Sequence, residues 1–205
     1  MRIEHQFSIA GFEVSVSFPD GWDADTLLPS FRPFYGKKEG QEKALLKCTV
    51  CTSVENKAAM PSGELIENTL SDMGYVSLYK EAEGYCVTLS AEQGGTLHVM
   101  QADRCFSVVS VFLHEEDKRA GHALSSLLRI AYSQAVLYWD AVSIHASAVF
   151  CENQAFLFMG KSGTGKSTHS ALWLKYIPGT ELLNDDNPTL RIVNGRVYAY
   201  GTPWS

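Results

Sequence analysis

The residues best suited to chemistry form one glycine-rich stretch, residues 160–167, which reads Gly-Lys-Ser-Gly-Thr-Gly-Lys-Ser. It fits the phosphate-binding pattern G-x-x-x-x-G-K-[ST] in full. Glycines let the backbone turn its N–H groups toward phosphate oxygens, and the N-terminus of a following helix attracts the same anion. Lys166 is expected to contact the β- and γ-phosphates of ATP, and the hydroxyl of Ser167 to bind Mg²⁺. An apolar strand-like segment, 155–159, precedes the stretch and a helical one, 167–176, follows, which favours a phosphate site over a chance match.

A pair of adjacent carboxylates, Asp185 and Asp186, follows a short apolar segment downstream of the glycine-rich stretch. One carboxylate can bind a metal ion while the other accepts a proton from an attacking hydroxyl. The surrounding sequence, Asn-Asp-Asp-Asn-Pro, is also typical of a solvated turn. Because the pair comes just after the expected loop, helix and strand, we favour the functional interpretation.

His145 is the third candidate, and it lies in an apolar segment, 143–150, that is predicted to be a strand. A single histidine in such a strand is more commonly a core residue whose hydrogen bonds are satisfied. The turn residues 152–154 predict that this strand pairs antiparallel with residues 155–159, which lead into the loop. An imidazole beside that strand would be able to orient a carboxylate near the phosphates.

Taken in order, these segments resemble the catalytic core of HPr kinase/phosphorylase and that of ATP-dependent PEP carboxykinase. The resemblance rests on residues 143–148, 156–168 and 183–186. Both families have a histidine on the strand before the loop, a Ser-Gly-x-Gly-Lys-[ST] loop, and an aspartate pair after the next strand. The resemblance implies an α+β protein in which a β-rich N-terminal domain precedes a P-loop core with a mixed sheet.

The resemblance also implies a role for each site residue. Asp185 would be the catalytic base, assisted by His145, with Lys166 on the phosphates, while Ser167 and Asp186 would bind Mg²⁺. The residues expected to bind ATP are Gly160, Ser162, Gly163, Thr164, Gly165, Lys166, Ser167 and Thr168.

The favoured function is ATP- and Mg²⁺-dependent phosphoryl transfer to a hydroxyl, with a serine of a small protein or peptide as the acceptor. One alternative is an enzyme related to PEP carboxykinase. It is disfavoured because that enzyme is much longer and needs basic residues for its dicarboxylate substrate, which we do not find in this sequence. The other is a nucleotide-binding module without turnover. The chain stops at Ser205, in what would be the middle of the family core, so we expect weak kinase activity and exposed apolar surface near Trp204.

The rest of the chain is expected to be mainly strands, with a β-rich domain at 1–115 and the linking helix plus P-loop core at 116–205. Residues 64–73 are predicted to form a short helix, and residues 114–138 a long amphipathic one. Alternating apolar residues predict hairpins around Ala10-Gly11 and Asn194-Gly195, a strand at 44–54, and the strand pairs 75–79 with 85–89 and 96–101 with 105–113.

Composition narrows the class of partner. The net charge of −6 gives no general attraction to nucleic acid or to an anionic membrane. The sequence lacks an apolar run long enough to span a bilayer, and its N-terminus does not resemble a signal peptide. Five cysteines, an odd number, argue against a complete disulfide framework and favour the cytoplasm. We therefore expect ATP and a protein or peptide acceptor as partners, and homo-oligomerisation stays open.

Overall fold

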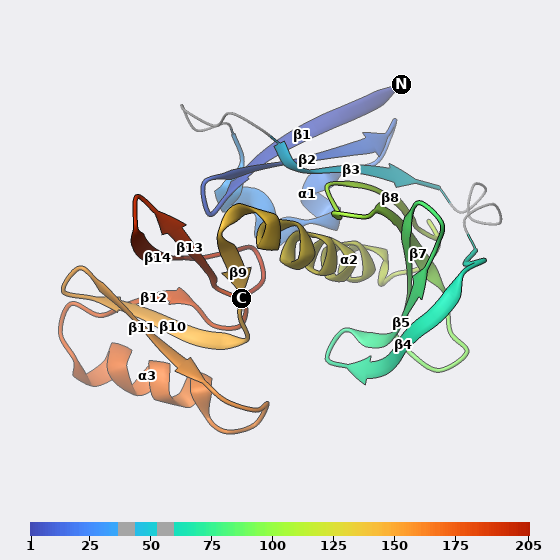
Figure 1. Cartoon of the computed structure of the whole chain (residues 1–205). Coiled ribbons are helices and arrows are strands. Elements are labelled where there is room, and N and C mark those ends of the chain that lie inside the picture. Colours follow the sequence, from blue (N-terminus) through green and yellow to red (C-terminus); the bar gives the residue numbers. More distant parts are fainter. Residues whose placement is uncertain (37–43, 53–59) are drawn as a thin grey trace. The chain divides into compact units, whose positions relative to one another are not determined.

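The computed structural model describes residues 1–36, 44–52 and 60–205 of the chain (Figure 1). The protein is α+β and mostly β, with 21% helix and 46% strand. It forms two compact units, one of residues 1–8 and 12–135 and the other of residues 9–11 and 136–205. This division differs from the expected boundary after residue 115, because the long helix packs on the sheet of the first unit.

The first unit is built on one eight-stranded mixed sheet, with the strand order β1-β2-β3-β8-β7-β6-β5-β4. The pairs β2–β3 and β3–β8 are parallel, whereas the strands from β8 to β4 pair antiparallel. The strands are β1 (Arg2–Ile9), β2 (Phe12–Pro19), β3 (Ala44–Cys51), β4 (Glu64–Ser71), β5 (Gly74–Lys80), β6 (Gly84–Ser90), β7 (His98–Asp103) and β8 (Val108–Phe112). The expected strand at 44–54 is confirmed over β3, and Val54 lies outside the described residues.

Helix α2 (Ala120–Ala135) contacts strands β3, β6, β7 and β8 and supplies much of the core of this unit. Its buried side chains recur at helical spacing, as the sequence predicted. The helix begins later than expected, because Asp117 ends the preceding loop by accepting the backbone N–H of Arg119 and a bond from His98. The described residues also form the short helices α1 (Ala24–Leu27), η1 (Pro29–Phe34) and η3 (Val136–Trp139).

The helix expected at residues 64–73 is wrong, because residues Glu64–Ser71 form strand β4. This strand pairs antiparallel with β5 from Glu64 to Ser71, with a register shift between Leu65 and Glu67, and Asp72 and Met73 make the turn between them. Gly74 therefore starts a strand and does not terminate a helix. Pairing with a neighbouring strand has overridden the local helix propensity of this segment.

The second unit contains two three-stranded sheets, with strand orders β11-β10-β12 and β14-β13-β9. Both hairpins predicted here are confirmed: Glu152-Asn153 joins β10 to β11, and Asn194-Gly195 joins β13 to β14. The elements are β9 (Ala141–Ser143), β10 (Ala146–Cys151), β11 (Gln154–Met159), α3 (Lys166–Tyr176), β12 (Glu181–Asn184), β13 (Thr189–Val193) and β14 (Arg196–Tyr200).

The strand expected at 143–150 is interrupted, because β9 pairs with β13 while β10 pairs with β11 and β12. Ile144 and His145 lie in the gap. The backbone N–H of Ile144 donates to the carbonyl of Pro188 at 3.1 Å, and that of Ala146 donates to the carbonyl of Asp186 at 3.0 Å. His145 is thus held beside the turn that contains Asp185 and Asp186, here called the acidic turn. It lies at a break between strands and not within a strand.

Trp204 is buried, with an exposed fraction of 6%, so the apolar surface expected there is not present at this side chain. Its backbone is tied to the acidic turn, since its carbonyl accepts the N–H of Asn187 at 3.1 Å. Within the described ranges, none of the helices is both long and apolar enough to cross a membrane.

Candidate functional site

The glycine-rich loop runs from Gly160 to Gly165 and connects strand β11 directly to helix α3. Gly163 and Gly165 have φ angles of +79° and +87°, which side chains rarely adopt, and Gly165 immediately precedes the helix. Thr164 tightens the loop by donating its hydroxyl to the carbonyl of Lys161 at 2.8 Å. Residues 160–165 are exposed, so an anion from solvent can reach the loop and the N-terminus of the helix, and within the loop the backbone N–H of Thr164 donates to the carbonyl of Lys161 at 3.3 Å.

Aromatic contacts hold α3 against the strand that feeds the loop. The ring of His169 packs edge-on against Phe158, with centroids 4.5 Å apart, and Trp173 packs against Phe156 at 4.8 Å. These contacts fix the direction in which the first turn of α3 points. Ser167 and Thr168 are exposed in that turn, where the sequence placed phosphate and metal contacts.

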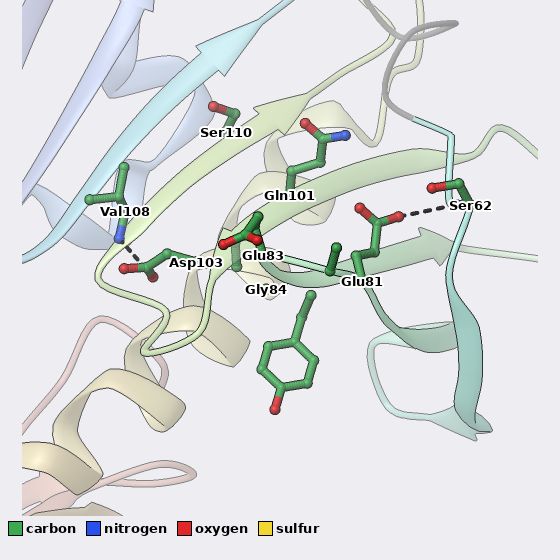
Figure 2. A pocket seen from close by; sticks show the side chains of 11 residues that line it. Ser62, Glu81, Glu83, Gly84, Gln101, Asp103, Val108 and Ser110 are labelled. Atoms are coloured by element: carbon green, nitrogen blue, oxygen red, sulfur yellow. Dashed lines mark hydrogen bonds between the residues drawn. The ribbon is translucent and has the colours of Figure 1, made fainter.

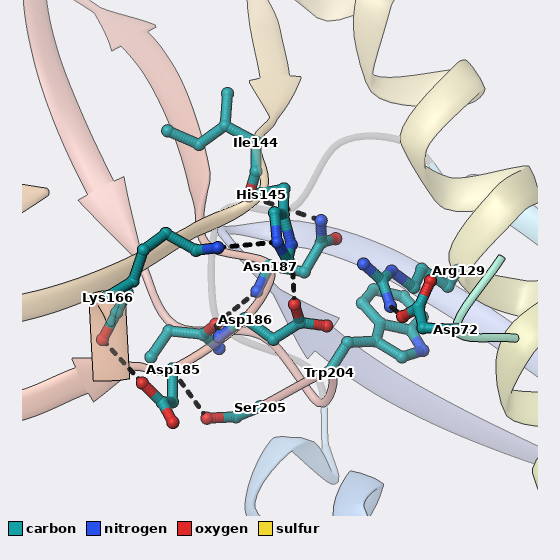
Figure 3. A network of polar contacts seen from close by, with 12 residues as sticks. Asp72, Arg129, Ile144, His145, Lys166, Asp185, Asp186, Asn187, Trp204 and Ser205 are labelled. Atoms are coloured by element: carbon teal, nitrogen blue, oxygen red, sulfur yellow. Dashed lines mark hydrogen bonds and ion pairs between the residues drawn. The ribbon is translucent and has the colours of Figure 1, made fainter. Parts of the chain in front are cut away.

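The side chain of Lys166 extends toward His145 (Figure 3). Its Nζ donates to the carbonyls of Gly160 at 3.1 Å and of Lys161 at 3.3 Å, and it lies 2.8 Å from Nε2 of His145. An ammonium group has three protons and no acceptor, so these contacts use its full donor capacity.

His145 lies between Lys166 and Asp186, and the three side chains form a continuous row (Figure 3). Because Lys166 only donates, Nε2 of His145 must accept, and the ring proton resides on Nδ1. Nδ1 in turn donates to Oδ1 of Asp186 at 2.9 Å. The imidazole is half-exposed, and the exposed fraction of the Asp186 side chain is 30%. The histidine therefore contacts Asp186 and not Asp185, the partner implied by the resemblance.

Asp185 is held by different groups. Its Oδ1 accepts the hydroxyl proton of Ser147 at 2.6 Å, and its backbone N–H donates to the hydroxyl of Ser205 at 2.9 Å. Ser147 also hydrogen-bonds Ser170 of helix α3. The two adjacent carboxylates thus lie in distinct environments, one beside an imidazole and the other against buried hydroxyls, which suits two separate chemical roles.

The turn that presents both carboxylates is shaped by Asn184, which is buried. Its Oδ1 accepts the backbone N–H of Asp186 at 3.1 Å and that of Asn187 at 2.7 Å, a typical Asx arrangement. Its Nδ2 donates to the carbonyl of Thr202 at 3.1 Å. The turn chemistry was visible in the sequence, but the tie to Thr202 joins residues too far apart for local pattern to indicate.

The structure therefore brings Lys166, His145 and Asp186 into direct contact and places Asp185 next to them in the same turn. It adds Ser147, Ser170 and Asn184, which sequence reasoning did not single out for the site. Their only sequence signal is that small polar residues interrupt otherwise apolar segments, a pattern that many exposed strands and helices share. In the described part of the chain, no group of three or more His, Cys, Asp or Glu residues is arranged to hold a metal ion.

The first unit has an open pocket of about 440 Å³ on its sheet (Figure 2). Acidic side chains line it, yet two of them are engaged in backbone turns. Asp103 accepts the N–H groups of Ser107 at 2.7 Å and of Val108 at 3.2 Å, and Glu81 accepts that of Ser62 at 3.1 Å. These bonds give the acidic groups a structural role in shaping the turns around the pocket.

Neither the protein-family models nor the curated proteins include a match to this chain.

Proposed function

We propose that this chain binds ATP through the glycine-rich loop and transfers its γ-phosphoryl group to a hydroxyl, as a kinase of the HPr-kinase type. The observation that carries the proposal is the row from Lys166 through His145 to Asp186, because it connects a phosphate-binding loop to a proton acceptor. The sequence resemblance supports the same P-loop core and a serine of a small protein or peptide as the acceptor.

Phosphate binding follows from the loop. The exposed loop at residues 160–165 and the N-terminus of α3 favour an anion, and Lys166 supplies a cation at the start of that helix. The charge of the phosphates attracts this ammonium more strongly than neutral carbonyl oxygens do, because Coulomb attraction between two opposite full charges adds to the hydrogen bond. We therefore expect Lys166 to leave the loop carbonyls and His145 when ATP binds.

Departure of Lys166 frees Nε2 of His145 as a proton acceptor. The acceptor hydroxyl gives its proton to Nε2 as its oxygen bonds to the γ-phosphorus, and the bond from that phosphorus to the bridging oxygen of ADP breaks. Asp186, already bonded to Nδ1, stabilises the imidazolium that forms. In the resting state Lys166 occupies Nε2, so the base becomes available only when the nucleotide is present.

The residues fit a magnesium ion bound together with the nucleotide. Mg²⁺ is usually held by one or two carboxylates plus the phosphates of its substrate, and its ligands are oxygens. The exposed hydroxyl of Ser167 and the carboxylate of Asp185, which the bond from Ser147 fixes through Oδ1, are such ligands. When bound, the ion would neutralise charge on the β- and γ-phosphate oxygens. This assignment exchanges the roles that the resemblance implied for Asp185 and Asp186, because His145 contacts Asp186.

The test compares Asp185→Asn with Asp186→Asn. Mg-ATP binding is measured by calorimetry at several Mg²⁺ concentrations, and turnover by release of ADP in the presence of serine-containing acceptor peptides. Asp186→Asn should retain Mg-ATP binding and lower turnover by roughly 10²–10⁴-fold, because it removes the carboxylate that orients His145 and stabilises its imidazolium while His145 acts as the general base. Asp185→Asn should raise the Mg²⁺ concentration that binding requires.

Asp140→Asn is the matched control, because Asp140 is an exposed aspartate of the same unit and lies between η3 and β9. It should behave as the wild type in both assays. The opposite pattern for the two aspartates would restore the roles implied by the resemblance. Absence of ATP binding to the wild type would overturn the proposed function.

A further inference from the structure

Two buried serine hydroxyls form a chain that ends on Asp185. Ser147 is fully buried and Ser170 is 1% exposed, and their hydroxyl oxygens are hydrogen-bonded to each other. Ser147 also lies 2.6 Å from Oδ1 of Asp185. Burying hydroxyl groups is costly unless they are hydrogen-bonded, so this chain is a defined structural feature of the unit.

The direction of the chain follows from proton counting. A serine hydroxyl has one proton, and an ionised carboxylate can only accept. Ser147 must therefore direct its proton to Asp185, as the geometry of that contact indicates. It follows that Ser170 is the donor in the bond between the two serines, and that the order is Ser170 to Ser147 to Asp185.

The chain connects three elements of the candidate site. Ser170 lies on α3 one helical turn after Lys166, on the helix that begins at the glycine-rich loop. Ser147 lies on β10, the central strand of its sheet, and Asp185 directly follows β12. Two hydrogen bonds thus connect the loop helix to the Asp185 carboxylate.

We propose that Ser147 and Ser170 are positioning residues that hold the Asp185 carboxylate in register with the glycine-rich loop, Ser147 directly and Ser170 through Ser147. The inference rests on the proposed function, in which Asp185 binds the magnesium ion that accompanies ATP. Groups that orient a metal-binding carboxylate commonly change metal affinity by about 10–100-fold when they are removed. Binding of ATP to Lys166 and the loop does not depend on this carboxylate.

The experiment measures thermal stabilisation by ATP while Mg²⁺ is titrated, and also without Mg²⁺. Ser147→Ala should raise the Mg²⁺ concentration for half-maximal stabilisation by roughly 10–100-fold and leave the Mg²⁺-free response to ATP unchanged. Ser170→Ala should give a smaller increase in the same direction. The double variant should match Ser147→Ala, because Ser170 acts on Asp185 through Ser147.

Ser143→Ala is the matched control, since its hydroxyl pairs with that of Thr189 at 3.3 Å in the same unit. It should leave the Mg²⁺ requirement unchanged. Ser147→Cys keeps the buried volume nearly constant and replaces the hydroxyl with a weaker donor, so it should give an intermediate requirement and remain folded if Ser147→Ala does not.

The relay is refuted if the wild type responds to Mg-ATP while Ser147→Ala and Ser147→Cys keep the wild-type Mg²⁺ requirement. It is also refuted if the effects of Ser147→Ala and Ser170→Ala simply multiply in the double variant. If the wild type itself shows no response to Mg-ATP, the proposed function fails and the relay fails with it. The result for the wild type therefore separates the two failures.

Discussion

Replacement of Asn184 by alanine tests whether this side chain builds the turn that carries both aspartates. The change removes three hydrogen-bonding interactions: two accepted from the backbone N–H groups of Asp186 and Asn187, and one donated by Nδ2 to Thr202, where the carbonyl at 3.1 Å and the hydroxyl at 3.4 Å share it. Each bond contributes about 0.5–1.5 kcal/mol net, so the loss sums to roughly 1.5–4.5 kcal/mol. The bond from Asn187 is partly backed up by the carbonyl of Trp204 at 3.1 Å, which favours the lower half of that range.

Thermal unfolding followed by circular dichroism measures this loss. For a chain of this length, a change of 1 kcal/mol shifts Tm by about 2–4 °C, so Asn184→Ala should lower Tm by roughly 3–10 °C. The matched control is Asn68→Ala, because Asn68 is exposed on strand β4 and should change stability by less than about 0.5 kcal/mol. Equal Tm values for the two variants would show that Asn184 does not hold the turn.

Two further predictions concern pH and backbone conformation. Burial lowers the pKa of His98 below its ordinary value of 6.5, so between the two values the unfolded chain binds more protons than the folded chain. The stabilisation that comes from neutral His98 should therefore be fully present above about pH 6.5 and decrease as pH falls below it. In a urea titration, the unfolding midpoint of His98→Gln should depend less on pH over that window than the midpoint of the wild type. The same pH dependence in both proteins would contradict this. Gly195 has φ +75° in the turn between β13 and β14, so Gly195→Ala should lower the free energy of unfolding by about 1–2 kcal/mol in the same urea titration. Gly195→Asn should lose less stability, because asparagine tolerates this conformation. Equal losses in the two variants would show that the positive φ angle does not cause the destabilisation.

Local pattern was sufficient for the elements whose signals lie within a few residues of each other. The hairpin turns at Glu152-Asn153 and Asn194-Gly195 have positive φ angles at both central positions, and the glycine-rich loop lies between strand and helix as the sequence predicted. The long helix was recognised from the spacing of its buried leucines. In these features, the residues of each short segment determine its backbone conformation without partners distant in the sequence.

Other features depend on partners distant in the sequence. Strand β4 was interpreted as a helix, because its register with β5 and not its own composition determines its conformation. The break at His145 arises from backbone bonds to Pro188 and Asp186, some forty residues away. The same break selects Asp186 as the partner of the imidazole, a choice between adjacent carboxylates that the sequence offered no means to make.

The central claim is that Lys166 and the glycine-rich loop bind the phosphates of ATP. The most direct measurement is the stabilisation of the wild type and of Lys166→Ala by Mg-ATP at millimolar concentration, followed by thermal unfolding. At about a hundred times the dissociation constant, the wild type should gain roughly 2.7 kcal/mol, whereas Lys166→Ala should gain nothing and unfold near the wild-type temperature without ligand. A wild type that is not stabilised by Mg-ATP, or a Lys166→Ala variant that is stabilised equally, would contradict the account.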